Sequence, residues 1–218
     1  MSGGADRPFD PERRLDAPAF HRNHEPMWSV IAPFLQNKTG DVLEMGSGTG
    51  QHIIEFARRM PDIVWWPSDI ETEHLDSIDA WRRHVRLPNV RAPLRIDISD
   101  PDWGLGRHEG PPARLVAIFS ANVLHISPWR VSEGLLAGGA RHLAPNGRLF
   151  VYGPFMRNGT HTAPSNAAFD LSLRRQHAEW GVRDADELGR RADRIGLEMT
   201  EIAEMPANNL ILIFEPKT

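Results

Sequence analysis

The sequence contains no cysteine, which excludes disulfide bonds and thiolate metal sites. Lysine is almost missing as well: Lys38 and Lys217 are the only two, and arginine supplies the other basic side chains. We attribute this bias to the composition of the genome rather than to a binding function. The formal net charge of −4 likewise gives no sign of the basic surface that nucleic-acid-binding proteins usually carry.

Long apolar runs are missing too. No run approaches the length of a membrane span, and the N-terminus lacks the apolar region of a signal peptide. We therefore expect a cytoplasmic protein without a membrane partner. Residues 1–18 are rich in Gly, Pro, Asp and Arg, and we expect them to be flexible. Residues 19–218 suffice for one large α/β domain, and no internal repeat divides them.

A glycine-rich loop is the most informative motif in the chain. The apolar run Val42–Met45 leads into Gly46, Gly48 and Gly50, and apolar residues at helical spacing follow from Ile53 onward. Glycines allow a sharp turn and let a ligand approach the backbone closely. The unpaired N–H groups at the start of the following helix attract an electronegative group. The pattern therefore predicts a strand, a ligand-binding loop and a helix.

The residues of this loop separate several kinds of ligand site. A P-loop would end in Gly-Lys-Ser or Gly-Lys-Thr, whereas this loop ends in Gly50–His52. A dinucleotide fingerprint would need glycine at position 51, which is Gln51. Two interpretations remain. The loop is either a glycine turn that binds no ligand, or a ligand-binding loop of the kind defined by the pattern Glu44–Gly50. This pattern resembles the first motif of class I S-adenosylmethionine (SAM)-dependent methyltransferases, and the resemblance implies that the acid organises the loop and contacts the methionine end of SAM.

Carboxylates follow the second and third predicted strands. Ile63–Pro67 leads to Asp69, our first choice to accept the two ribose hydroxyls, with Glu71 as the second choice. Either acid could instead cap or begin the helix predicted over Thr72–Val85. Val90–Ile96 is the third predicted strand. By the resemblance, the acid after it binds the adenine amino group and the next apolar side chain flanks the ring.

The fourth predicted strand, Leu115–Phe119, is a continuous apolar run, as expected for a central parallel strand that is covered on both faces. Asn122 follows it, beside the first strand, at the edge where ligands of open α/β sheets bind. The predicted SAM-binding residues are Glu44, Gly46, Ser47, Gly48, Gly50, Asp69, Ile70, Asp97, Ile98 and Asn122.

Further elements are predicted at both ends of the chain. A helix over Ala19–Phe34 should break or begin at Pro26, and its polar stretch Arg22–Glu25 is either a solvated face or a lid over the cofactor. Trp103 is expected to be a packing anchor. The other predicted elements are a helix at 128–143, a turn at 145–147, a strand at 148–152, an insertion at 153–183 with a helix at 166–177 capped by Ser165, a helix capped at Asp184, and strands at 197–205 and 209–214.

The alternation of strands and helices predicts an α/β fold, with a parallel sheet and helices on both faces. A short turn joins the last two strands, so they should be antiparallel. The resemblance then implies the Rossmann-like class I methyltransferase fold, with a seven-stranded, mostly parallel sheet and one antiparallel strand.

A narrower resemblance spans Ala19 to the end of the chain. The sequence resembles the DUF938 family, which includes the animal methyltransferase-like protein 26. The matching segments are Arg22–Pro26, Glu44–His52, Trp66–Asp69, Asn122–Trp129, Tyr152–Phe155, His161–Asn166, Phe169–Asp170 and Met205–Asn209. The chain departs from the family at Met45–Gly46, where many relatives carry Ile-Ala. The resemblance implies the fold and SAM as cofactor, but no substrate.

Methyl transfer requires a positioned acceptor, and a general base only if the acceptor must lose a proton. His161, Tyr152 and His125 are the catalytic candidates, although His125 could be a packed core histidine and Tyr152 simply a strand end. The group Asp170, Arg174 and Arg183 either forms ion pairs within the insertion or recognises an acidic substrate. The histidines show no metal-binding spacing, so no metal is expected.

We expect a small-molecule acceptor, no nucleic-acid partner, and a monomer or homodimer. The alternatives are a non-catalytic SAM-binding protein that regulates a partner, and a methyltransferase that acts on nucleic acid or protein.

Overall fold

The structure is a computed structural model and describes residues 13–107 and 110–217. Most of the segment expected to be flexible, residues 1–12, lies outside the described residues. The helices are α1 (Pro18–Leu35), α2 (Gln51–Arg59), α3 (Thr72–Val85), α4 (Trp129–His142), α5 (Pro164–Gln176) and α6 (Ala185–Arg194), with 3-10 turns η2 (Leu124–Ile126) and η3 (Pro206–Asn208). The strands are β1 (Gly40–Met45), β2 (Ile63–Asp69), β3 (Leu94–Arg95), β4 (Leu115–Ala121), β5 (Leu143–Gly153), β6 (Phe155–Arg157), β7 (Thr160–His161), β8 (Arg183–Asp184), β9 (Leu197–Met205) and β10 (Asn209–Pro216).

The main sheet has seven strands in the order β3-β2-β1-β4-β5-β10-β9. The five neighbouring strands β3, β2, β1, β4 and β5 pair in parallel. Strand β10 runs antiparallel to both β5 and β9. This arrangement confirms the predicted α/β fold with one antiparallel strand. Because β1 and β4 are neighbours, the strand order reverses between them, and the carboxyl ends of β1, β2 and β4 meet at one edge.

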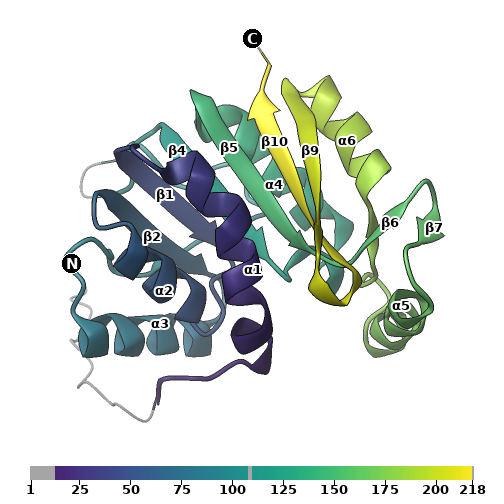
Figure 1. The fold of residues 1–218 in the computed structure, drawn as a ribbon, viewed down its shortest axis with the longest axis horizontal. Coiled ribbons are helices and arrows are strands. Elements are labelled where there is room, and N and C mark those ends of the chain that lie inside the picture. The colour runs from purple at the N-terminus through teal and green to yellow at the C-terminus, as the bar shows by residue number, and fades with distance from the viewer. Residues whose placement is uncertain (1–12, 108–109, 218) are drawn as a thin grey trace.

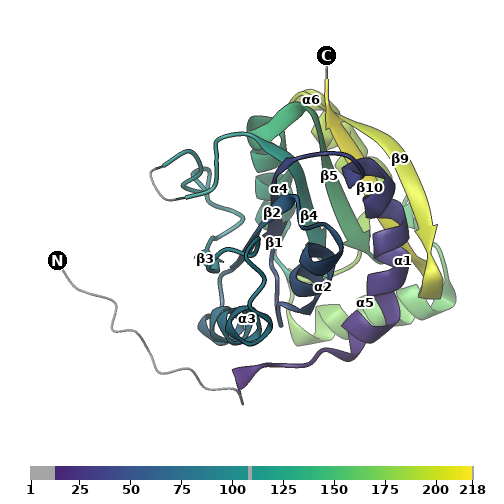
Figure 2. The same ribbon diagram turned by 60° about the vertical axis from the view of Figure 1, so that its left-hand side comes forward.

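Helices cover both faces of this sheet (Figures 1 and 2). Successive residues of β1 alternate between two cores. Val42 packs with the buried residues of α1 and α2, and Leu43 packs with those of α4 and α6. Trp103 is a packing anchor, as predicted, since its ring fills the space over Gly138, where an added Cβ would lie 2.0 Å from the ring. Among the described residues, no helix is both long and apolar enough to cross a membrane.

Two predictions for segments that contain proline were wrong. Helix α1 begins at Pro18 and continues through Pro26, because its buried stripe, which includes Met27 and Ile31, is held against the sheet. The third strand is much shorter than predicted, since only Leu94–Arg95 forms a ladder with β2. Val90 makes an isolated bridge, and Pro93 between them has no N–H to donate.

Two local predictions near β5 and α5 were also wrong. The residues expected to form a turn, 145–147, lie inside β5, where the register with β4 shifts. Helix α5 begins at Pro164, so Ser165 lies inside the helix and cannot be its cap. The predicted cap of α6 is confirmed, because the Asp184 carboxylate accepts a hydrogen bond from the Glu187 backbone N–H at 2.9 Å.

Candidate functional site

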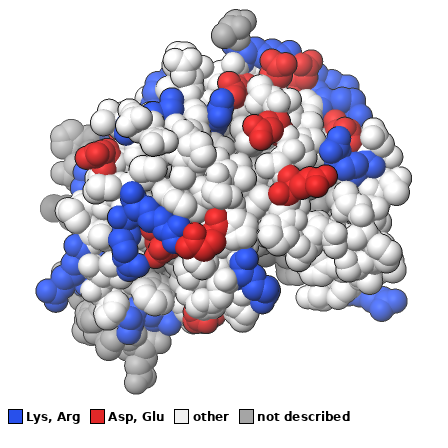
Figure 3. Space-filling view, in the orientation of Figure 1, with Lys and Arg blue, Asp and Glu red and all other residues white. Residues whose placement is uncertain are grey.

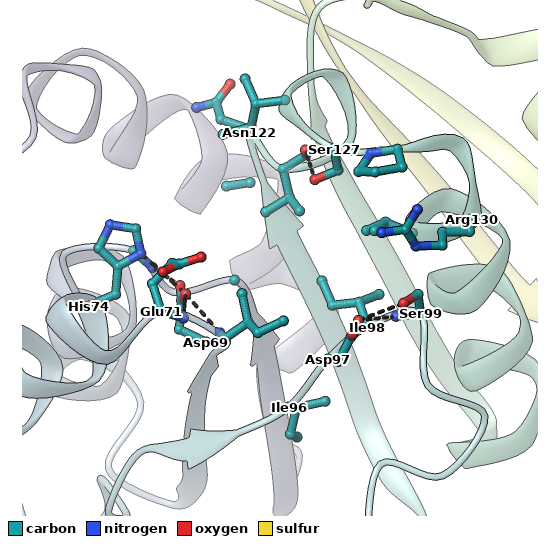
Figure 4. Close-up of a pocket in the computed structure, with 18 of the residues that line it drawn as sticks. Asp69, Glu71, His74, Ile96, Asp97, Ile98, Ser99, Asn122, Ser127 and Arg130 are labelled. Carbon is teal, nitrogen blue, oxygen red and sulfur yellow. Dashed lines mark hydrogen bonds and ion pairs between the residues drawn. The ribbon is translucent and has the colours of Figure 1, made fainter. Parts of the chain in front are cut away.

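A cavity of about 490 Å³ opens at the carboxyl ends of β1, β2 and β4 (Figure 4). Seven of the ten predicted SAM-binding residues line it: Gly46, Gly48, Asp69, Ile70, Asp97, Ile98 and Asn122. Sequence segments that are far apart therefore meet in one space, as the strand order predicts. The cavity is large enough for a ligand of the size of a nucleoside cofactor.

The glycines of the loop are required by backbone geometry. Gly46 has φ +74°, and an added Cβ would lie 2.5 Å from a methyl group of Val123. Gly48 has φ +54°, and an added Cβ would meet nothing within 4 Å. The backbone at Gly48 therefore faces open space in which a ligand could approach it.

Asp69 connects the end of β2 to this loop. Its Oδ2 accepts a hydrogen bond from the Gly48 N–H at 2.8 Å, and its Oδ1 accepts from the Ile70 and Glu71 N–H groups. The His74 ring lies 3.1 Å from Oδ1. Burial acts to raise the pKa of Asp69, but these hydrogen bonds outweigh it and lower the pKa. Asp69 is thus a negative charge at neutral pH, held at the edge of the cavity.

Glu44 lies behind the glycine loop and does not line the cavity. Its side chain is 1% exposed, and Oε2 has no hydrogen-bond partner. Its pKa is raised to about 8, mainly by burial and also by the charge of Asp69, while a hydrogen bond with Ser47 acts to lower it. A buried carboxyl oxygen without a partner fits a ligand with an ammonium group, such as the methionine end of SAM.

Ser47 and Gly50, also predicted to bind SAM, support the loop rather than line the cavity. The Ser47 backbone N–H donates to the Ser68 carbonyl at 2.7 Å, and the Ser68 N–H donates to the Ser47 hydroxyl at 3.1 Å. Gly50 has φ +87° and is the N-cap of α2. These contacts hold the loop against β2.

The remaining wall of the cavity contains apolar side chains open to solvent. Ile70 is 48% exposed and Ile126 is 43% exposed, which is high for isoleucine. Ile98 and Val131 lie in the same lining. An apolar ligand surface such as a purine ring would remove these side chains from water.

None of the three catalytic candidates lines this cavity. Burial lowers the pKa of His125 to about 4, with the charge of Arg183 adding to the effect, so His125 is neutral at pH 7. Its ring contacts Phe169 of α5 edge-on, with the ring centroids 5.4 Å apart. Burial raises the pKa of Tyr152, although a hydrogen bond with Asn23 and the charge of Arg22 oppose this.

His161 lies in the insertion, beside α5. Its Nε2 is 3.6 Å from Oδ2 of Asp170, and its Nδ1 is buried without a hydrogen-bond partner. Asp170 also pairs with Arg174 at 2.9 Å, which supports the expectation of ion pairs within the insertion. His161 therefore has a carboxylate on one nitrogen and an unpaired second nitrogen.

Helix α1 is bound to the start of α2. The Ala17 N–H donates to Oε1 of Gln51 at 2.7 Å, and the Asn23 side-chain oxygen is 2.7 Å from Nε2 of His52. Asn23 is only 5% exposed, so the polar stretch Arg22–Glu25 is not simply a solvated face.

Among residues 13–107 and 110–217, no group of three His, Asp or Glu side chains is arranged to hold a metal ion.

Comparison with known proteins assigns the chain to a family. The model of the family described as "Protein of unknown function (DUF938)" matches residues 14–216. The chain belongs to the DUF938 family. This description assigns no activity to the family. Similarity to solved structures shows which fold the chain has.

Several solved structures share the fold of this DUF938 protein. An O-methyltransferase family protein from Burkholderia thailandensis matches with a TM-score of 0.74 and 17% identity, over 92% of this chain and 58% of that one. Human N-acetylserotonin methyltransferase in complex with SAM matches with a TM-score of 0.70 and 14% identity, over 92% and 53%. LepI in complex with S-adenosylhomocysteine and a substrate analogue matches with a TM-score of 0.65 and 13% identity, over 84% and 44%. The DUF938 chain thus has the Rossmann-like methyltransferase fold and spans about half the length of these proteins.

Several residues that line the cavity of the DUF938 protein were not among the predicted site residues. These residues include His74, Ser99, Ser127, Arg130 and Trp180. Ser99 directly follows the predicted residues Asp97 and Ile98, so its position in the sequence could have predicted that it lines the cavity. Trp180 lies more than fifty residues from the fourth strand, and no local pattern places it there.

Proposed function

We propose that this protein is a SAM-dependent methyltransferase that acts on a small-molecule acceptor. The observation that carries the proposal is the cavity at the ends of β1, β2 and β4, with the unpaired carboxyl oxygen of Glu44 buried behind the glycine loop. The shared fold with a SAM-bound methyltransferase and an S-adenosylhomocysteine-bound protein supports SAM as the ligand.

We assign a group of the protein to each part of SAM, either in the cavity or directly behind the glycine loop. The ribose hydroxyls would donate hydrogen bonds to Asp69. They would replace the ring of His74, which makes the longest of the hydrogen bonds to Asp69, at 3.1 Å. The adenine would lie by Asp97 and Ile98, and the methionine end on Gly46–Gly50 with its ammonium group toward Glu44. When bound, SAM supplies a methyl group on a sulfonium, which an acceptor atom can displace in line.

The protein's own residues would orient the acceptor and exclude water. The insertion at 153–183 leaves the sheet at the end of β5, so we propose that it covers the acceptor. His161 is our candidate to accept a proton from the acceptor through Nδ1, while Asp170 holds Nε2. On the face drawn in Figure 3, acidic and basic side chains are interspersed, which supports a small molecule over nucleic acid.

Calorimetry with S-adenosylhomocysteine tests the cofactor. We expect binding to the wild type, and Asp69→Ala should weaken it by about 1–3 kcal/mol if buried hydrogen bonds to ribose are lost. NAD at the same concentration should give no thermal stabilisation, because Gln51 replaces the glycine of the dinucleotide fingerprint. Equal stabilisation by NAD and S-adenosylhomocysteine would overturn the assignment.

SAM with a radiolabelled methyl group tests the acceptor class. The protein is incubated with the small-molecule and macromolecular fractions of a cell extract, and we expect label in the small-molecule fraction. Label in protein or nucleic acid would favour a macromolecular acceptor. Binding of S-adenosylhomocysteine without label in either fraction would favour the non-catalytic regulatory protein.

A further inference from the structure

Trp180 belongs to the insertion, yet it lines the same cavity as Asp97 and Asn122. Four residues of the segment after β4 line the cavity as well: Ile126, Ser127, Pro128 and Arg130. In Figure 4, Ser99, Ser127 and Arg130 lie on the side of the cavity opposite Asp69 and His74. Trp180 therefore adds an aromatic ring to the wall formed by the end of β4 and the start of α4.

The chain on both sides of Trp180 is bound to the segment after β4. The Gly181 N–H donates to the His125 carbonyl at 2.9 Å, and the Arg183 guanidinium donates to the Ser127 carbonyl. Arg130 pairs with Glu179 at 3.8 Å. These three contacts hold Trp180 close to the cavity.

Helix α5 holds the same segment from the other side. The Asp170 carboxylate accepts a hydrogen bond from the Val182 N–H at 2.7 Å. Gly181 has φ +153°, and an added Cβ would lie 2.7 Å from the Arg174 guanidinium and 2.8 Å from Oδ1 of Asp170. Only glycine fits at this position, so the backbone next to Trp180 is fixed between α5 and the segment after β4.

We propose that Trp180 forms the outer wall of the adenosine end of the cofactor site, so that the insertion binds cofactor as well as covering the acceptor. The inference rests on the proposed SAM-binding function. The adenosine end is assigned because residues near Trp180 in the chain contact Arg130 and the Ser127 carbonyl. Figure 4 shows Ser127 and Arg130 on the side of the cavity where Asp97, Ile98 and Ser99 lie. An aromatic ring beside a nucleobase stabilises it by stacking.

The test compares two ligands on two variants by calorimetry. S-adenosylhomocysteine and 5′-methylthioadenosine share the adenosine half, but only the first has an amino-acid end. Trp180→Ala should weaken both by a similar factor, at least about fivefold, as expected for a lost base–aromatic contact. Trp180→Phe keeps an aromatic ring and should recover most of the affinity. Trp28→Ala is the control, because Trp28 of α1 packs on Phe56 of α2 and does not line the cavity.

Each outcome has one meaning. If the wild type does not bind S-adenosylhomocysteine, the proposed function itself fails. If the wild type binds and Trp180→Ala binds both ligands equally well, the role of Trp180 is overturned while the function stands. A loss confined to S-adenosylhomocysteine would contradict the adenosine assignment.

Fluorescence gives a second readout that does not depend on the folding of the alanine variant. The difference in emission between the wild type and Trp180→Phe reports Trp180 alone. We expect this difference to change when S-adenosylhomocysteine is added. An unchanged difference at saturating ligand would also overturn the proposal.

Discussion

Glu44 shows how one residue can link ligand binding to stability. It is buried, and its pKa is raised from 4.5 to about 8, mainly by burial. Between these values the unfolded chain carries an ionised Glu44 and the folded chain a protonated one. The stability associated with the raised pKa is therefore fully present below pH 4.5 and is lost as the pH rises through 8.

Glu44→Gln should be more stable than the wild type above pH 8, since Gln has no charge to bury. We expect a rise in Tm of about 2–4 °C or more, the shift that 1 kcal/mol produces in a chain of this size. The gain should shrink toward pH 4.5. Thermal denaturation at several pH values measures it, and the same variant should lose affinity for S-adenosylhomocysteine.

Glu204→Gln is the matched control, because Glu204 is exposed on β9. It should change neither the Tm nor the affinity. If Glu44→Gln behaves like this control at pH 8, Glu44 is not a buried carboxyl group held for a cationic ligand.

At the scale of elements, the insertion is organised around Asp170. This carboxylate binds the Val182 backbone, pairs with Arg174 and lies near His161. Asn166, one turn earlier in α5, donates to the Asn208 carbonyl at 2.9 Å and so connects the insertion to η3. The insertion is thus fixed to the sheet at several points, and His161 is held in a defined position beside it.

His161→Ala should leave the affinity for S-adenosylhomocysteine within about twofold, since His161 does not line the cofactor cavity. Transfer of the labelled methyl group to the small-molecule fraction should fall by about 100-fold, the lower end of the rate loss expected when a general base is removed. His84→Ala, on the distant helix α3, is the control and should keep full transfer. Full turnover by His161→Ala would make the insertion a packing element.

For the whole molecule, buried histidines oppose Glu44 in their effect on stability. Burial lowers the pKa of both His52 and His125 to about 4. Their contribution is present above pH 6.5 and is lost as the pH falls from 6.5 through 4, because only the unfolded chain takes up the protons in that range. As the pH falls from 8 to 6.5, Glu44 increases stability. His74 acts in the same direction, because its hydrogen bond with Asp69 raises its pKa above 6.5.

We therefore predict that the stability of the wild type is greatest at about pH 6.5 and falls on both sides. Urea denaturation between pH 4.5 and 8.5 measures this. His125→Gln should reduce the loss on the acid side, and Glu44→Gln should reduce the loss on the alkaline side. A wild-type stability that rises steadily to pH 8 would contradict the buried, protonated state of Glu44.

Some features of this protein were determined by the sequence alone. The glycine loop, the strand before it, the helix after it and the cap of α6 by Asp184 depend on backbone conformation and hydrogen bonds within a few residues. The positions of Asp69 and Asp97 at strand ends placed both at the same edge, because parallel strands all end there. Local patterns suffice for features of this kind.

Other features were decided only by tertiary structure. Packing against the sheet carries α1 through Pro26, and the catalytic candidates lie outside the cavity because α5 and the core hold them elsewhere. Trp180 reaches the cavity through hydrogen bonds between residues more than fifty positions apart, such as that from Gly181 to His125. Contacts over such distances depend on how the elements pack together, which no short stretch of sequence records.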